Sequence, residues 1–186
     1  EKWATRMKNT IAHIATEITM KRMMDDYFER FYEKLGKQRK KIHPSDFKGA
    51  KELAEWKGKI VGVWNQIRVL EKSIYDFANN PLPLGESFKA DIVLDIKDLN
   101  PEDVGMELLI ARRVNGKNHI VLKELMSQKT VKNLGDSEIP EGTGTMVKYT
   151  ANAKITFSGV YEYGFRIFPQ HPLLANPQDF NQVTWL

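Results

Sequence analysis

The sequence contains no cysteine among its 186 residues. Disulfide frameworks, thiolate metal sites, iron–sulfur clusters and cysteine nucleophiles are therefore excluded. No apolar run approaches the ~20 residues of a membrane-spanning helix, which excludes an integral membrane protein. Histidine is scarce, with four residues, and no pair of them has the spacing of a helical zinc motif. The lack of cysteine is typical of a reducing compartment, and we expect a cytoplasmic protein.

Charge is concentrated in the first 80 residues, which hold 17 of the 28 basic and 11 of the 24 acidic side chains. The densest basic run comprises Lys37, Arg39, Lys40 and Lys41. Such a run can contact a nucleic-acid backbone, or it can be the solvated end of a helix, where the helix dipole favours cations. No aromatic residue within 36–41 could stack on a base, so the pattern favours the solvated helix end over nucleic-acid binding.

Apolar spacing predicts three helices in the first part of the chain. The first covers residues 2–17, the second runs from the N-cap Thr19 to a stop at Gly36, and the third covers residues 44–64. The second helix carries a stripe of methionine and aromatic residues. Such a stripe can be a cofactor or partner groove, but more commonly it packs against a protein core. The few predicted helices carry several apolar faces, and the first residue, Glu1, falls within a helical pattern. Together these features predict that the chain is a piece of a longer parent protein.

The second part of the chain alternates in polarity with a period of two, most clearly over residues 88–97, and the dipeptide Asn115-Gly116 predicts a hairpin turn. We expect six or seven short antiparallel strands. The fold class is therefore predicted as α+β, with a helical segment over residues 1–66 followed by an antiparallel, immunoglobulin-like β-sandwich over residues 67–186.

No arrangement of residues supports catalysis, metal binding or cofactor binding, so no such residue is assigned. Four aromatic residues near the C-terminus are candidates for stacking on a sugar, as in small carbohydrate-binding modules. The alternative is that the tyrosines fill the core and the tryptophan anchors the C-terminus, because aromatic residues are strand formers and core fillers first. The candidate glucan-contacting residues are Tyr161, Tyr163, Phe168 and Trp185.

Two segments resemble bacterial α-glucan (glycogen, starch or maltodextrin) phosphorylases. The first resembles the last helical stretch of the catalytic body and contains Thr10-Ile11-Ala12-His13-Ile14-Ala15, Thr19, Arg22-Met23, Asp26-Tyr27 and Phe31-Tyr32. The second is similar to the end of the same proteins and contains Ser158-Gly159, Tyr161, Tyr163-Gly164, Arg166, Pro169, His171-Pro172, Leu174, Pro177, Asp179-Phe180 and Trp185-Leu186.

The resemblance implies a parent enzyme that depends on pyridoxal phosphate and cleaves α-1,4-glucan with phosphate to glucose 1-phosphate, with retention. It implies that the lysine that holds the cofactor lies upstream, so this chain itself carries no cofactor. The expected partners are the upstream catalytic lobes of the parent and, in the parent, α-1,4-glucan. Two other functions remain open: a glucan-binding sandwich module, and a basic helical domain that binds proteins or nucleic acid. Homo-oligomer formation also remains open.

Overall fold

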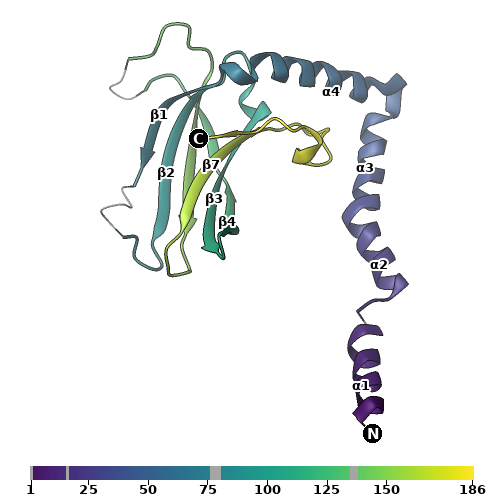
Figure 1. Cartoon of the computed structure of the whole chain (residues 1–186). Coiled ribbons are helices and arrows are strands. Elements are labelled where there is room, and N and C mark those ends of the chain that lie inside the picture. The colour runs from purple at the N-terminus through teal and green to yellow at the C-terminus, as the bar shows by residue number, and fades with distance from the viewer. Residues whose placement is uncertain (1, 16, 76–80, 135–137) are drawn as a thin grey trace. The chain divides into compact units, whose positions relative to one another are not determined.

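The computed structural model describes residues 2–15, 17–75, 81–134 and 138–186, except for the side chains of residues 44–46 and 178 (Figure 1). The chain forms two compact units, Glu1–Leu53 and Ala54–Leu186. Each is described by itself below. The boundary predicted at residues 66/67 stays a prediction.

The first unit is helical. Its elements are α1 (Lys2–Thr10), a wider π-type turn η1 (Ile11–Ala15), α2 (Met20–Tyr27), a second such turn η2 (Phe28–Tyr32) and α3 (Glu33–Ile42). Thr19 is the N-cap of α2, as predicted, because its hydroxyl accepts a hydrogen bond from the backbone N–H of Arg22 at 3.2 Å. The stop predicted at Gly36 is wrong. Gly36 keeps helical backbone geometry inside α3, since it lacks the positive φ of a helix-ending glycine.

No described side chain of residues 2–53 is buried. The exposed surface of α2, η2 and α3 carries ion pairs one turn apart, between Lys21 and Asp25 at 2.7 Å and between Glu33 and Lys37 at 2.6 Å. Exposed pairs of this kind add little to the stability of a helix, because water screens the attraction between the charges. The helices of this unit therefore gain little from packing within the unit itself.

Helix α4 (Pro44–Val63) crosses the division between the units, and its last turns belong to the second unit. The short 3₁₀ turn η3 (Trp64–Gln66) follows α4. Ile60 of α4 and Trp64 of η3 are buried in the core of the second unit. The indole N–H of Trp64 donates to the Thr184 hydroxyl at 3.0 Å, and that of Trp56 donates to Asp103 Oδ1 at 2.8 Å. Both indole N–H groups thus have a hydrogen-bond acceptor, and these bonds fix the end of α4 on the sheets.

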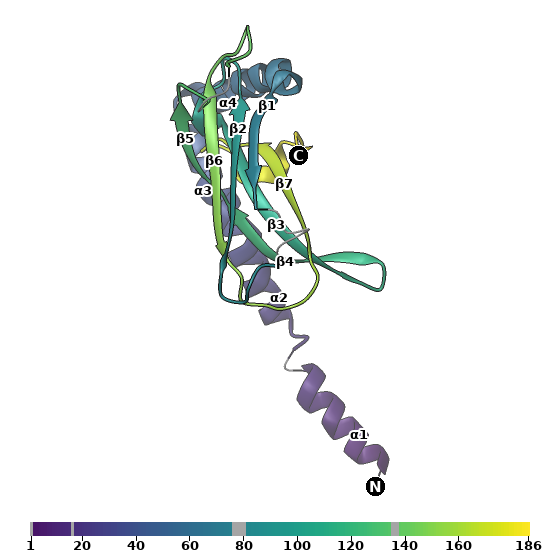
Figure 2. The same cartoon turned by 90° about the vertical axis from the view of Figure 1, so that its left-hand side faces the viewer.

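The second unit contains two four-stranded antiparallel sheets, which Figure 2 shows from the side of β1 and β2. One sheet has the order β1-β2-β6-β5 and the other β4-β3-β7-β8. The strands are β1 (Arg68–Ile74), β2 (Ser87–Asp95), β3 (Val104–Val114), β4 (Lys117–Leu125), β5 (Ser127–Val131), β6 (Met146–Lys154), β7 (Glu162–Pro169) and β8 (Thr184–Trp185). The predicted α+β class with antiparallel sheets is confirmed.

The two sheets share one buried apolar cluster, which alternate residues of β2, β3, β6 and β7 supply. At its centre the Tyr149 hydroxyl donates to the Val104 carbonyl at 2.8 Å, and burial raises the pKa of Tyr149. Asn115 and Gly116 both have positive φ between β3 and β4, which confirms the predicted hairpin turn. Within the described residues, no helix has the length and hydropathy needed to cross a membrane.

Candidate functional site

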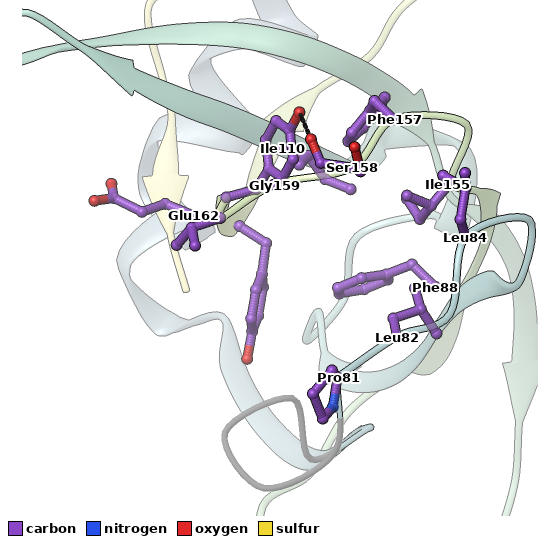
Figure 3. A pocket seen from close by; sticks show the side chains of 13 residues that line it. Pro81, Leu82, Leu84, Phe88, Ile110, Ile155, Phe157, Ser158, Gly159 and Glu162 are labelled. Atoms are coloured by element: carbon purple, nitrogen blue, oxygen red, sulfur yellow. Dashed lines mark hydrogen bonds between the residues drawn. The ribbon is translucent and has the colours of Figure 1, made fainter.

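A hollow of about 410 Å³ lies at the end of the sandwich where β6 leads into β7. Its walls come from segments that lie far apart in the sequence. They are the residues before β2, the start of β2, the middle of β3, the connection from β6 to β7, and the start of β7. In Figure 3 the side chains of Leu82, Leu84, Phe88 and Ile155 gather on one side of this hollow. The volume and the mostly apolar walls are typical of a small-molecule pocket.

Aromatic rings form much of the wall. Phe88 and Tyr163 meet edge to face at 5.2 Å, and Phe157 and Tyr161 are tilted against each other at 4.6 Å between ring centroids. The Tyr161 hydroxyl donates to the Ser158 carbonyl at 2.9 Å, dashed in Figure 3. Gly159 has a φ of 134°, and a Cβ there would lie 3.2 Å from the Tyr161 ring. The glycine therefore permits a backbone shape that brings this ring back over its own loop.

The structure brings together two of the four predicted aromatic residues. Tyr161 and Tyr163 both line the hollow, and Tyr163 is 45% exposed. Phe168 alternates with Phe165 and the other core-facing residues of β7, so it lies on the outer face of the sheet. Trp185 is also on the outer face, because it pairs with Arg166 across β7 and β8.

On that outer face Trp185 is 60% exposed, and the Arg166 guanidinium lies 5.7 Å from the centre of its ring. The ring also lies over Gly164, where a Cβ would come within 3.5 Å of it. A flat sugar could not contact Trp185 and the hollow at once, since the sheet separates them. Whether any of the four residues contacts glucan stays a prediction.

Sequence reasoning missed the other half of the aromatic wall. Phe88 was expected only as the start of the alternating stretch over residues 88–97, and Phe157 was not among the candidate glucan-contacting residues. A pattern of alternation does place both on the inner face, but it does not show that the two strand ends meet. Only the antiparallel pairing of β2 with β6, which puts Phe88 opposite Ala153, brings them to one end of the sandwich.

Buried charges in the second unit are paired rather than exposed to a ligand. Asp95 is fully buried and accepts hydrogen bonds from Lys97 Nζ at 2.6 Å and from the backbone N–H groups of Lys97 and Gly144, both at 3.0 Å. Burial raises the pKa of this carboxyl, but the hydrogen bonds and charge of Lys97 and the amide of Gly144 outweigh burial and hold the pKa below its ordinary value. Glu107 forms ion pairs with Arg166 and Lys123.

The predicted basic run lies on α3, and Lys37 there pairs with Glu33. Among the described residues, no group of three or more histidine, aspartate or glutamate side chains could hold a metal ion. Of the residues that the structure describes, no lysine lines the hollow, so the hollow does not fit a pyridoxal Schiff base. The chemistry that these surfaces can offer is binding: apolar contact and stacking in the hollow, and charge on the strands beside it.

Comparisons with known proteins show similarity to one part of glycogen and maltodextrin phosphorylases. The sequence model of the family described as the glycogen phosphorylase C-terminal domain matches residues 64–186. Maltodextrin phosphorylase of Thermococcus litoralis is 24% identical over 185 residues, which are 99% of this chain and 20% of that protein. Glycogen phosphorylase of Mycobacterium bovis is 22% identical over 184 residues, again 99% of this chain and 20% of that protein. The chain thus spans about a fifth of the length of these relatives.

Proposed function

Because the chain belongs to the glycogen phosphorylase C-terminal domain family, we propose that it is the non-catalytic C-terminal region of an α-glucan phosphorylase. In this proposal the pyridoxal phosphate, the α-1,4-glucan and the phosphorolysis that yields glucose 1-phosphate belong to the remainder of a cytoplasmic parent protein. The role of this chain is to brace that catalytic body. The matches to about 20% of each relative support the proposal, since most of an enzyme of that length lies outside this chain.

The observation that carries the proposal is the helical stripe, which we define as the eight apolar residues facing one side of α2, η2 and α3. Every one of them is between 45% and 67% exposed. A continuous apolar surface of this kind on a soluble unit marks a surface that another protein element covers. We propose that the catalytic body covers it. The stripe consists of Met20, Met23, Met24, Tyr27, Phe28, Phe31, Tyr32 and Leu35.

Placing a charge in the helical stripe tests this role in the complete gene product. We expect Phe31→Glu to lower phosphorolytic activity and thermal stability together, because a carboxylate would be forced into an apolar interface. Glu29→Ala is the matched control, since Glu29 lies in the same turn η2, two residues away and outside the helical stripe. Glucose 1-phosphate release and the melting temperature are the measurements. Equal behaviour of the two variants would rule out docking through the stripe.

We also infer an immunoglobulin-like topology for the second unit. The support is the strand order. If the eight strands are lettered A, B, C, C′, D, E, F and G along the chain, the two sheets have the orders A-B-E-D and C′-C-F-G. Sheets of this composition, packed face to face, are typical of immunoglobulin-like sandwiches.

Glucan binding by the hollow is a second candidate function, which the meeting of Tyr161, Tyr163, Phe88 and Phe157 around one cavity favours. The apolar C–H face of a glucose residue can pack on such rings. We expect the 186-residue chain to migrate more slowly in native gels that contain glycogen, and Tyr163→Ala to restore its mobility. Trp185→Ala, on the other face of the sheet, is the control. Unchanged mobility of the native chain would remove this candidate.

A further inference from the structure

The inner face of β3 continues past the hollow into the hairpin that β3 forms with β4. Ile110 lines the hollow, and Arg112 follows it on the same face, about 7 Å further along the strand. Strand β4 places His119 directly opposite Arg112 and Lys117 opposite Val114. Figure 2 shows this hairpin extending beyond the neighbouring strands of the sandwich. We call Arg112, Lys117 and His119 the basic rim; all three are exposed.

No acidic residue occurs between positions 108 and 123. Within the described part of the chain, no ion pair or hydrogen bond of the structure joins the basic rim to a carboxylate. Glu162 is the acidic residue of the neighbouring strand β7 and borders the hollow, but it pairs with Ala111, which is an outer-face position of β3. Asn118 Nδ2 donates to its carboxylate at 2.9 Å, and Figure 3 shows that carboxylate pointing away from the apolar wall. The rim therefore keeps its positive charge toward solvent.

Register also brings the rim next to the aromatic wall. Tyr163 pairs with Ile110, and Arg112 follows Ile110 by two residues on the same face of β3, so Arg112 lies diagonally across from Tyr163. Tyr163 and Arg112 both belong to inner-face positions of the same sheet, and Tyr161 lines the same hollow as Tyr163. One small molecule could thus contact an aromatic ring at one end and a guanidinium at the other.

We propose that the hollow and the basic rim form one binding site for a phosphorylated hexose. The sugar ring lies against Tyr161 and Tyr163, and the phosphate is held by Arg112 with Lys117 and His119. Arginine presents paired N–H donors that match phosphate oxygens, and the charge makes each hydrogen bond stronger than a neutral one. The inference rests on the proposal that the hollow binds a sugar ring. It adds that the basic rim binds a phosphate group on the same molecule.

Calorimetric titration of the 186-residue chain tests the site with separate probes: glucose 1-phosphate, glucose 6-phosphate, maltotriose and inorganic phosphate. We expect at least one hexose phosphate to bind about tenfold more tightly than either maltotriose or phosphate, since it alone makes both kinds of contact. Added salt should weaken hexose phosphate binding and leave maltotriose binding unchanged.

Two neighbouring arginines provide the matched variants. Arg112→Ala is expected to reduce hexose phosphate affinity about tenfold, to the level of maltotriose, whereas Arg113→Ala removes the same charge from the opposite face and should change nothing. Both side chains are exposed, so both variants should fold. Equal losses in the two variants, or equal affinity for phosphate and hexose phosphate, would overturn the inference. Tight maltotriose binding with no preference for a hexose phosphate would overturn the inference but would leave the proposal of glucan binding unaffected. If no sugar bound, both the inference and the proposal of glucan binding would be wrong.

Discussion

Replacing Phe165 by alanine is expected to lower the free energy of unfolding of the 186-residue chain by about 4 kcal/mol. Phe165 is fully buried on β7, with its ring 6.3 Å from that of Phe88 and 5.9 Å from that of Tyr163. Truncation removes contacts to both and leaves a cavity between two sheets that cannot close without moving strands. Urea unfolding followed by tryptophan fluorescence measures the change, since Trp56 and Trp64 both pack in this unit.

Phe31→Ala is the matched control, because it makes the same chemical change in the helical stripe. Phe31 is 52% exposed, and we expect the free energy of unfolding to change by no more than about 0.5 kcal/mol. A loss for Phe31→Ala as large as that for Phe165→Ala would mean that the stripe is already packed in this chain. The proposed catalytic body would then not be needed to cover it.

Asp95→Asn is expected to cost about 3 kcal/mol at neutral pH. The side chain is fully buried and accepts hydrogen bonds from Lys97 and Gly144, and Arg68 Nη2 lies 3.3 Å from Oδ2. An amide of the same shape loses the charge and turns an N–H₂ group toward these donors. Lys97 also has a φ of 58°, so the turn that depends on this carboxylate lies in a backbone conformation that non-glycine residues seldom adopt.

The role of the Asp95 charge also predicts how the free energy of unfolding changes with pH. The pKa of Asp95 is lowered in the folded chain, whereas the pKa of an aspartate in an unfolded chain is about 3.9. Its stabilisation is therefore complete above about pH 4 and is lost as the pH falls through the lower folded value. The difference in unfolding free energy between the native chain and Asp95→Asn should shrink on acidification. Asp98→Asn, 72% exposed, should show little difference at any pH, and a constant difference for Asp95→Asn would contradict the role of its charge.

Local signals in the sequence predicted local structure well. The hydroxyl at Thr19, the alternation along β2 and the Asn115-Gly116 turn each act over a few residues, and all three are confirmed. Gly36 misled the prediction because a single glycine costs a helix only about 1 kcal/mol and does not by itself end it. Two short strands, β5 and β8, were missed, since they are five and two residues long and owe their place to pairing with β6 and β7.

The candidate site was harder to predict than the strands. Alternation puts Tyr161 and Tyr163 on one face and Phe168 on the other, but sequence alone grouped them because they are close along the chain. Tyr163 meets Phe88, 75 positions earlier in the chain, and pairs with Ile110, 53 positions earlier. The pairing of β2 with β6 and of β3 with β7 brings these residues together. The basic rim went unnoticed for the same reason: its residues matter only once Arg112 is seen on the same strand face as Ile110.

Hydrogen exchange over residues 2–42 tests most directly whether these helices are made to lie against a larger body. It is measured in the complete gene product and in the 186-residue chain under the same conditions. We predict at least tenfold slower exchange of the α2 and α3 amides in the complete protein, because docking of the helical stripe would suppress local opening. Equal rates in the two proteins would contradict the proposed bracing role.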